Sequence, residues 1–231
     1  MLKQAARKEG YRFAFVFLSL ALVAATIAGS AVSLPAQDES VQRDRWQRPD
    51  EVMDALGIKA GSAVADVGAG NGYFTFHFAT RVGPTGKVYA EDVRENEMAD
   101  IHSGAQKKGL NQIETIVGTP DDPKLPAGTL DAVLVCNAYH EMHDYDAMLQ
   151  GMYKALKPGG IIGIIDAAAQ PGQPRGSYYQ PHHIPKELVR DDLARNGFHF
   201  LREGRGFVPP DEGTRTYYFL IFEKPATPAG K

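Results

Sequence analysis

Short apolar runs alternate along this chain with stretches whose apolar residues recur every three or four positions. The apolar runs predict strands, and they lie at residues 62–67, 87–93, 113–118, 130–140 and 161–166. The stretches with helical spacing lie at residues 50–57, 73–82, 96–109, 145–156 and 186–198. Strands that alternate with helices are typical of a parallel sheet covered by helices on both faces.

The last two predicted strands, at residues 198–204 and 216–224, have no helix between them. Two strands joined without a crossover helix are expected to pair antiparallel. The fold class that follows is α/β, with a Rossmann-like, doubly wound, mostly parallel sheet and a C-terminal antiparallel strand pair. The order of the strands within the sheet does not follow from their order along the chain.

A basic stretch, MLKQAARKEGYR, precedes a segment that carries no charge from Phe13 to Gln37. The segment is long enough to span a hydrocarbon core of roughly 30 Å, and small residues near Gly29 and Ala31 suit a cleavage site. We expect a hydrophobic helix at residues 1–37 that serves as a signal peptide or as a membrane anchor. The positive-inside rule then predicts an exported chain, periplasmic or membrane-anchored, with its domain outside the cytoplasm.

The remaining sequence has the size of one domain. Residues 38–48 predict a polar linker, residues 49–224 the folded domain and residues 225–231 a disordered tail. The net charge is −3 and no dense run of lysine and arginine occurs, which argues against a nucleic-acid partner. Cys136 is the one cysteine, so neither an internal disulfide nor a cysteine-based zinc cluster can form.

A glycine-rich turn, GAGNG, follows the first predicted strand in the stretch VADVGAGNGYF, residues 64–74. A dinucleotide site favours G-x-G-x-x-G, whereas here the bulky Tyr73 and Phe74 follow at once. Asp66, just before the turn, would repel a phosphate and attract an ammonium or sulfonium group. Asp92, at the end of the second strand, suits the hydroxyls of a ribose. The pattern predicts a nucleoside with a cationic arm, and S-adenosylmethionine fits that description.

The same stretch resembles the first motif of the class I S-adenosylmethionine-dependent methyltransferases. KVYAEDV resembles the second-strand motif of this family, and LKPGGIIGIID resembles its fifth-strand motif. IVGTPDDPKLPAGTLDAVLVCNAYHEM resembles the segment through its third and fourth strands, so the likeness covers roughly Arg48 to Lys224. The resemblance implies an enzyme that methylates an acceptor, which we expect to be a small molecule. It implies cofactor contacts at Asp66, Gly68, Ala69, Gly70, Asn71, Gly72, Asp92, Thr119, Asp121 and Asn137.

Two of these cofactor contacts involve a choice between neighbouring residues. Many family members carry an acid after the third strand that meets the adenine amino group. Here that place is occupied by Gly118, Thr119 and Pro120, with acids following, so Thr119 and Asp121 are both candidates. Glu91 precedes Asp92, but the pleat of a strand points the two side chains to opposite faces, and we favour Asp92.

The candidates for chemistry lie in NAYHEMHD, at the end of the fourth predicted strand and beside the expected methyl group. His140 is placed to act as a base for a hydroxyl or thiol, and Glu141 to orient that base or bind the acceptor. Alternatively, both side chains only fix the turn into the next helix. His140, Glu141 and His143 are residue types that bind metals, but the spacing is not H-E-x-x-H, so we predict no metal site.

The loop SYYQPHHIP follows the fifth strand, at an edge where loops carry specificity. Tyr178, Tyr179, His182 and His183 either line a pocket for a flat or apolar substrate or pack on the domain. The leading interpretation of the whole chain is an exported or membrane-tethered methyltransferase. The alternative is a non-catalytic nucleoside-binding domain of the same fold.

Overall fold

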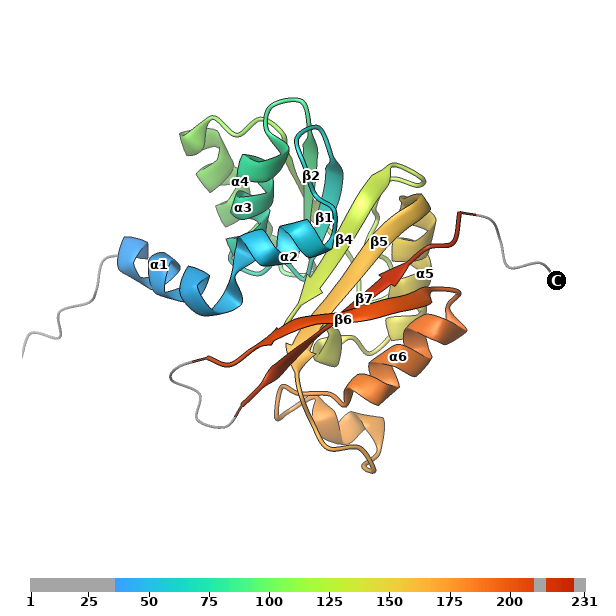
Figure 1. Ribbon diagram of the computed structural model, residues 1–231. Coiled ribbons are helices and arrows are strands. Elements are labelled where there is room, and N and C mark those ends of the chain that lie inside the picture. Colours follow the sequence, from blue (N-terminus) through green and yellow to red (C-terminus); the bar gives the residue numbers. More distant parts are fainter. Residues whose placement is uncertain (1–35, 210–214, 227–231) are drawn as a thin grey trace, which may run out of the picture. The chain divides into compact units, whose positions relative to one another are not determined.

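The computed structural model describes residues 36–209 and 215–226 (Figure 1). In this part of the chain the α-helices are α1 (Ala36–Gln47), α2 (Pro49–Ala55), α3 (Tyr73–Val82), α4 (Glu95–Lys108), α5 (Tyr145–Ala155) and α6 (Lys186–Arg195). The strands are β1 (Ala63–Val67), β2 (Lys87–Asp92), β3 (Ile113–Val117), β4 (Leu130–Cys136), β5 (Leu156–Ala167), β6 (His199–Phe207) and β7 (Tyr217–Glu223). Two short 3₁₀ helices are η1 (Tyr139–Glu141) and η2 (Arg175–Tyr178).

All these strands form one sheet in the order β3-β2-β1-β4-β5-β7-β6. The strands β1 to β5 pair in parallel, and β7 runs antiparallel to both β5 and β6. The prediction of a parallel sheet with a C-terminal antiparallel pair is therefore confirmed. The chain proceeds outward from β1 to one edge and from β4 to the other, and the gap at their carboxyl ends is where such sheets bind ligands.

Helices cover both faces of the sheet, as Figure 1 shows. Alternation along β4 makes this possible, because Val133 and Val135 pack in one buried cluster and Ala132 and Leu134 in another. The first cluster includes residues of α5 and α6, and the second includes residues of α2 and α3. A further buried group around Met98 and Ile101 attaches α4 to the second face. The sheet is thus a central layer that holds the ends of its strands rigidly.

Most of the segment that we predicted to be a linker, residues 38–48, belongs to the helix α1, which ends at Gln47. The helix docks on the domain through polar contacts: the Tyr73 hydroxyl donates to Asp44 Oδ1 at 2.6 Å, and the Arg43 guanidinium lies 3.8 Å from the Tyr73 ring centroid. Trp46 packs against Phe207, with ring centroids 6.3 Å apart. A helix that docks mainly through such polar contacts needs no apolar period in its own sequence. The sequence pattern therefore predicted a linker.

The predicted hydrophobic helix at residues 1–37 lies outside the described residues, apart from the first positions of α1. Among the residues described, no helix combines the length and the apolar character that crossing a membrane requires. The strand β5 begins earlier than predicted, at Leu156 instead of residue 161. A register shift next to Leu130 lets that residue pair with Leu156, which extends the strand back through the segment KPGG.

The strand β6 forms one edge of the sheet and is mostly exposed. Its pairing with β7 shifts register between Phe200 and Arg202 and again between Gly204 and Phe207. Charged side chains occupy much of its length, and the Arg190 guanidinium covers the exposed Phe200 ring at 4.0 Å from its centroid. These features interrupt the regular hydrogen-bonding pattern at this edge.

The core that carries the sheet can be tested at Leu134, which is fully buried in β4. Leu134→Ala removes packed methyl groups and leaves a cavity, so we expect the free energy of unfolding to fall by about 2–5 kcal/mol. Leu201→Ala in β6 is the matched control, because that side chain is 40% exposed and its loss should change stability by less than about 0.5 kcal/mol. Urea unfolding followed by circular dichroism measures both. Equal losses in the two variants would contradict this placement of the core.

Candidate functional site

A cavity of about 530 Å³ opens at the carboxyl ends of β1, β2 and β4. Eight of the residues predicted to act in the site line it, namely Gly68, Ala69, Gly70, Asn71, Asp92, Thr119, Asn137 and Glu141. Four predicted residues do not line it, namely Asp66, Gly72, Asp121 and His140. The structure therefore gathers residues from distant segments at the edge where a ligand was expected.

The glycine turn depends on glycine at its first position. Gly68 has a φ of +69°, which side-chain-bearing residues rarely adopt. A Cβ atom there would lie 2.4 Å from the Cβ atom of Ala138, in the loop after β4. The missing side chain lets the loops after β1 and β4 lie in contact, so that both line the same cavity.

Asp92 is held in place at the end of β2 by several N–H donors. The Gly70 amide donates to its Oδ2 at 3.0 Å, and Arg94 donates to both oxygens from its side chain at 2.9–3.0 Å. Burial would raise the pKa of Asp92, but these hydrogen bonds outweigh burial, and the pKa lies below its ordinary value. The carboxylate is therefore ionised and directed at the glycine turn, as a group that accepts hydrogen bonds from ribose hydroxyls must be.

Glu91 also lines the cavity, although we expected the pleat to turn it away. The side chain is 1% exposed, and its Oε1 atom has no hydrogen-bond partner. Burial raises the pKa of Glu91 to about 8, with smaller contributions from the neighbouring carboxylates Asp92 and Asp66. A buried oxygen without a partner in a cavity wall is the kind of group that a ligand satisfies.

Asp66 lies behind the glycine turn and not in the cavity. It is 3% exposed, and the Thr75 hydroxyl of α3 donates to its Oδ2 at 2.7 Å. Burial raises the pKa of Asp66 to about 6, against the hydrogen bonds from Thr75 that lower it. The side chain ties β1 to α3 across the turn, so a contact between Asp66 and the cofactor stays a prediction.

The segment after β3 places Thr119 on the cavity wall and Asp121 beside it. The Thr119 hydroxyl donates to Asp121 Oδ1 at 2.8 Å, and the backbones of Thr119 and Asp122 exchange two hydrogen bonds. Asp121 therefore orients Thr119 in this structure. Of the two candidates for the adenine contact, Thr119 is the residue that lines the cavity.

The segment after β4 brings Asn137 and Glu141 to the opposite wall of the cavity. Asn137 has a φ of +55°, an uncommon conformation outside glycine, while its N–H donates to Ile165 O of β5. Glu141 lines the cavity and its side chain is 62% exposed. His140 lies behind it with a fully buried side chain.

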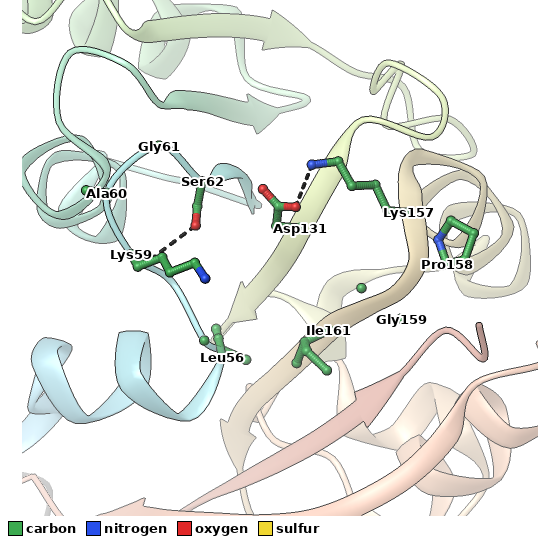
Figure 2. A pocket seen from close by; sticks show the side chains of 12 residues that line it. Leu56, Lys59, Ala60, Gly61, Ser62, Asp131, Lys157, Pro158, Gly159 and Ile161 are labelled. Atoms are coloured by element: carbon green, nitrogen blue, oxygen red, sulfur yellow. Dashed lines mark hydrogen bonds and ion pairs between the residues drawn. The ribbon is translucent and has the colours of Figure 1, made fainter.

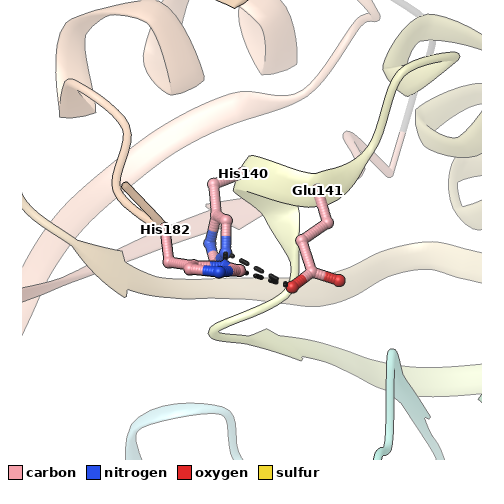
Figure 3. A group of neighbouring side chains, drawn as sticks. All are labelled: His140, Glu141 and His182. Atoms are coloured by element: carbon pink, nitrogen blue, oxygen red, sulfur yellow. Dashed lines mark hydrogen bonds and ion pairs between the residues drawn. The ribbon is translucent and has the colours of Figure 1, made fainter. Parts of the chain in front are cut away.

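Two residues far away in sequence surround His140, as Figure 3 shows in part. Its Nδ1 atom lies 2.8 Å from Oδ1 of the buried Asp166, at the end of β5. Its Nε2 atom lies 3.1 Å from His182 Nδ1, in the loop before α6. In the same loop, Tyr179 packs on His143 with ring centroids 4.3 Å apart, and His143 lines the cavity. Tyr178 is buried, and His183 lies against its ring.

Several cavity residues were not predicted from the sequence. Arg43 reaches the cavity from α1, and Glu91, Arg94, Cys136 and His143 also line it. Arg94 carried the clearest signal, because it follows Asp92 by two residues at the start of α4. Arg43 carried none, since nothing in the local pattern reveals that α1 packs beside the glycine turn.

A second cavity, of about 370 Å³, lies at the opposite end of the strands (Figure 2). Asp131 and Lys157 form an ion pair on its wall, and the Asp131 carboxylate also accepts a hydrogen bond from the Ala63 amide. This cavity is at the amino ends of β1, β4 and β5, whereas open α/β sheets bind ligands beyond the carboxyl ends. Its polar contacts join the strands to one another.

The sequence matches the profile of the ubiE/COQ5 methyltransferase family over residues 39–181. The match spans more than half of the chain and contains the glycine turn, Asp92 and the segment after β4. The chain belongs to the ubiE/COQ5 methyltransferase family. It is accordingly an S-adenosylmethionine-dependent methyltransferase, and S-adenosylmethionine is its cofactor.

One curated relative is similar to this methyltransferase in sequence, and two solved structures share its fold. It is 25% identical over 177 residues to the ubiquinone/menaquinone biosynthesis C-methyltransferase UbiE of Escherichia coli O1:K1 / APEC, which covers 74% of this chain and 69% of the relative. A SAM-dependent methyltransferase from Aquifex aeolicus has a TM-score of 0.65 at 23% identity, covering 83% of this chain and 100% of its own. Phosphoethanolamine N-methyltransferase 2 of Haemonchus contortus, solved with S-adenosyl-L-methionine, has a TM-score of 0.63 at 16% identity, covering 78% of this chain and 53% of its own.

The raised pKa of Glu91 makes a prediction about stability. Its ordinary pKa is 4.5, and in the folded methyltransferase it is about 8, so between these pH values the folded state holds a proton that the unfolded state has released. The stability that this group contributes is present below pH 4.5 and is lost as the pH rises through 8. Glu91→Gln cannot lose that proton. We compare the free energies of unfolding of the variant and the parent chain. From pH 5 to pH 8.5, this difference should change in favour of the variant by on the order of 2–4 kcal/mol.

Urea unfolding of both proteins at the two pH values measures this difference. Glu95→Gln is the control, because Glu95 is exposed at the start of α4. Its stability relative to the parent chain should stay the same at both pH values. If Glu91→Gln and Glu95→Gln respond to pH in the same way, Glu91 does not bind a proton on folding.

Proposed function

We propose that this methyltransferase transfers the methyl group of S-adenosylmethionine to a small-molecule acceptor in the cavity of about 530 Å³. The observation that carries the proposal is the composition of the two walls. One wall holds the glycine turn and Asp92, and the other holds Glu141 and His143. A cofactor held at the first wall places its reactive end toward titratable side chains of the second.

The residues of the first wall fit the cofactor. Gly68 keeps the turn on the cavity wall, because a side chain there would overlap Ala138, and Asp92 presents an ionised carboxylate for the ribose hydroxyls. Glu91 offers a buried oxygen that lacks a partner within the protein. When it is bound, S-adenosylmethionine supplies an already activated methyl group. The protein therefore contributes mainly position, which is worth many powers of ten in rate.

The residues of the second wall act on the acceptor. Glu141 lies on the cavity wall, so of the predicted catalytic pair it is the residue placed to contact an acceptor directly. His140 is buried behind it, with its Nε2 atom 3.6 Å from Glu141 Oε1. We assign His140 an indirect role. Its ring is buried, so an acceptor in the cavity contacts the neighbours of His140 and not the ring itself.

The acceptor is expected to have a flat or apolar body. Met142 and Met148 contribute thioether side chains to the wall, and methionine adapts to apolar ligands of irregular shape. His143 presents an imidazole ring that is backed by Tyr179. An aromatic ring on the cavity wall favours a planar acceptor over a chain of charged groups.

The assignment of Asp92 predicts a loss of cofactor affinity. Asp92→Ala removes charge-assisted hydrogen bonds to ribose that are worth roughly 1.5–3 kcal/mol in total, so S-adenosylmethionine should bind about ten- to a hundredfold more weakly. Asp100→Ala is the matched control, because Asp100 is exposed on α4 and does not line the cavity. Isothermal titration calorimetry on each folded variant measures the affinities. Unchanged affinity in Asp92→Ala would remove the ribose role from this residue.

We also propose that residues 1–37 direct the chain out of the cytoplasm, either as a cleaved signal or as an anchor. The support is the basic stretch followed by a run without charge from Phe13 to Gln37. Neither the fold nor the family bears on this question. The domain would then meet its acceptor on the far side of the membrane.

A reporter fused after Lys231 tests the location. Alkaline phosphatase, which folds only where disulfides form, should be active in the fusion, whereas a reporter that works only in the cytoplasm should be inactive. Replacing two leucines of the uncharged run, Leu18 and Leu20, by arginine should reverse both results, because a charged helix centre opposes insertion. Strong activity of the cytoplasmic reporter in the parent fusion would end the proposal.

A further inference from the structure

We infer that His140, Glu141 and His182 form a binding site for a divalent transition-metal ion of the zinc class. Three atoms that can donate an electron pair face one another here (Figure 3). His140 Nε2 lies 3.1 Å from His182 Nδ1 and 3.6 Å from Glu141 Oε1, and the latter two atoms are 3.4 Å apart. The site lies beside the cofactor cavity, because Glu141 lines that cavity.

The triangle of ligand atoms has the size that zinc requires. Bonds of about 2.0–2.1 Å in a tetrahedral arrangement separate neighbouring ligand atoms by roughly 3.3–3.4 Å. The three distances between the ligand atoms, 3.1, 3.4 and 3.6 Å, lie around that separation. Two histidines and one carboxylate are also a ligand set that zinc uses in catalytic sites, where the fourth position stays open for water or substrate.

Asp166 prepares His140 for this role. Its Oδ1 atom lies 2.8 Å from His140 Nδ1, and its Oδ2 atom accepts a hydrogen bond from the His140 amide. Both side chains are fully buried. A carboxylate that holds one ring nitrogen of a histidine fixes the ring and leaves the other nitrogen as a lone-pair donor, which is the usual outer support of a metal-binding histidine.

The hydrogen bonds within the protein do not satisfy the three ligand atoms. With the proton of His140 on Nδ1, its Nε2 atom is an acceptor, and Glu141 Oε1 is an acceptor as well. His182 Nδ1 can donate one hydrogen bond, and this single N–H group cannot serve both His140 Nε2 and Glu141 Oε1. The alternative to a metal ion is therefore a chain of hydrogen bonds from Asp166 through His140 to His182, with the exposed Glu141 carboxylate hydrated by solvent.

His182 is held in position at a cost to the backbone. Its φ is +53°, a conformation that residues other than glycine adopt only when their surroundings impose it. The Arg215 side chain donates to the carbonyl oxygens of Pro181 and His182 at 2.8 and 3.3 Å. The loop before α6 is thus fastened so that this imidazole faces His140.

The open fourth position suggests what the ion would do, and this part rests on the proposed methyl transfer. An acceptor with a thiol, phenol or enol group would replace the bound water, forming a metal–sulfur or metal–oxygen bond. Its proton would pass to solvent, because a metal ion stabilises the deprotonated form. The acceptor would then be present as a thiolate or an oxyanion at neutral pH.

Metal uptake by the untagged full chain tests the inference. After treatment with a chelator and dialysis, the chain is titrated with Zn²⁺ in competition with a chromophoric chelator. We expect one tightly bound ion per chain. His182→Ala and Glu141→Gln each remove one ligand at an exposed position and should bind Zn²⁺ at least about a hundredfold more weakly, and Asp166→Asn about 10- to 100-fold more weakly. His183→Ala, the adjacent histidine outside the triangle, should bind like the parent chain.

Two results would overturn the site: a parent chain that binds no Zn²⁺, or a His182→Ala variant with unchanged affinity. Titration with Co²⁺ adds a geometric readout, since a tetrahedral site gives intense visible absorption that His182→Ala should lack. Calorimetry with S-adenosylmethionine on the same variants separates this inference from the proposed function. Loss of metal with intact cofactor binding bears on the triangle alone, whereas absent cofactor binding with one Zn²⁺ per chain would count against the proposed function alone.

Discussion

The close approach of Gly68 to Ala138 is the contact on which the site depends. These residues begin the loops after β1 and β4, the neighbouring strands from which the chain proceeds to opposite edges of the sheet. Any side chain at position 68 would push the loops apart, because its first carbon would overlap the Ala138 methyl group. With glycine there, the glycine turn and the segment after β4 line the same cavity. The parallel pairing of β1 with β4 keeps these two loops side by side.

Much of this arrangement could be predicted from the sequence, because it follows from patterns among residues that are close together along the chain. The alternation of apolar runs and helical periods identified the sheet and the antiparallel position of its last strands. The glycines after β1 and the acid that ends β2 follow strands whose carboxyl ends meet at one edge. The glycine turn and Asp92 could therefore be predicted as cavity residues, because each lies at the carboxyl end of a strand.

The remaining parts of the site depend on contacts between distant segments, which no local pattern reveals. The helix α1 docks through Arg43 and Asp44, so its sequence has no apolar stripe. Glu91 and Asp92, the last two residues of β2, both line the cavity, which the alternation of side chains along a strand does not predict. His140 meets Asp166 and His182 only once β5 and the loop before α6 are in place. A search for H-E-x-x-H spacing could not find ligands 42 residues apart.

The irregular edge strand β6 has a consequence for how this protein behaves among copies of itself. A long, flat edge offers a row of free amide and carbonyl groups on which another sheet can grow, and such growth leads to aggregates. In β6 two register shifts twist that row, and the exposed Phe200 lies under an arginine side chain. The opposite edge, β3, is only five residues long. Both edges of the sheet thus carry features that oppose its elongation by a strand of another copy.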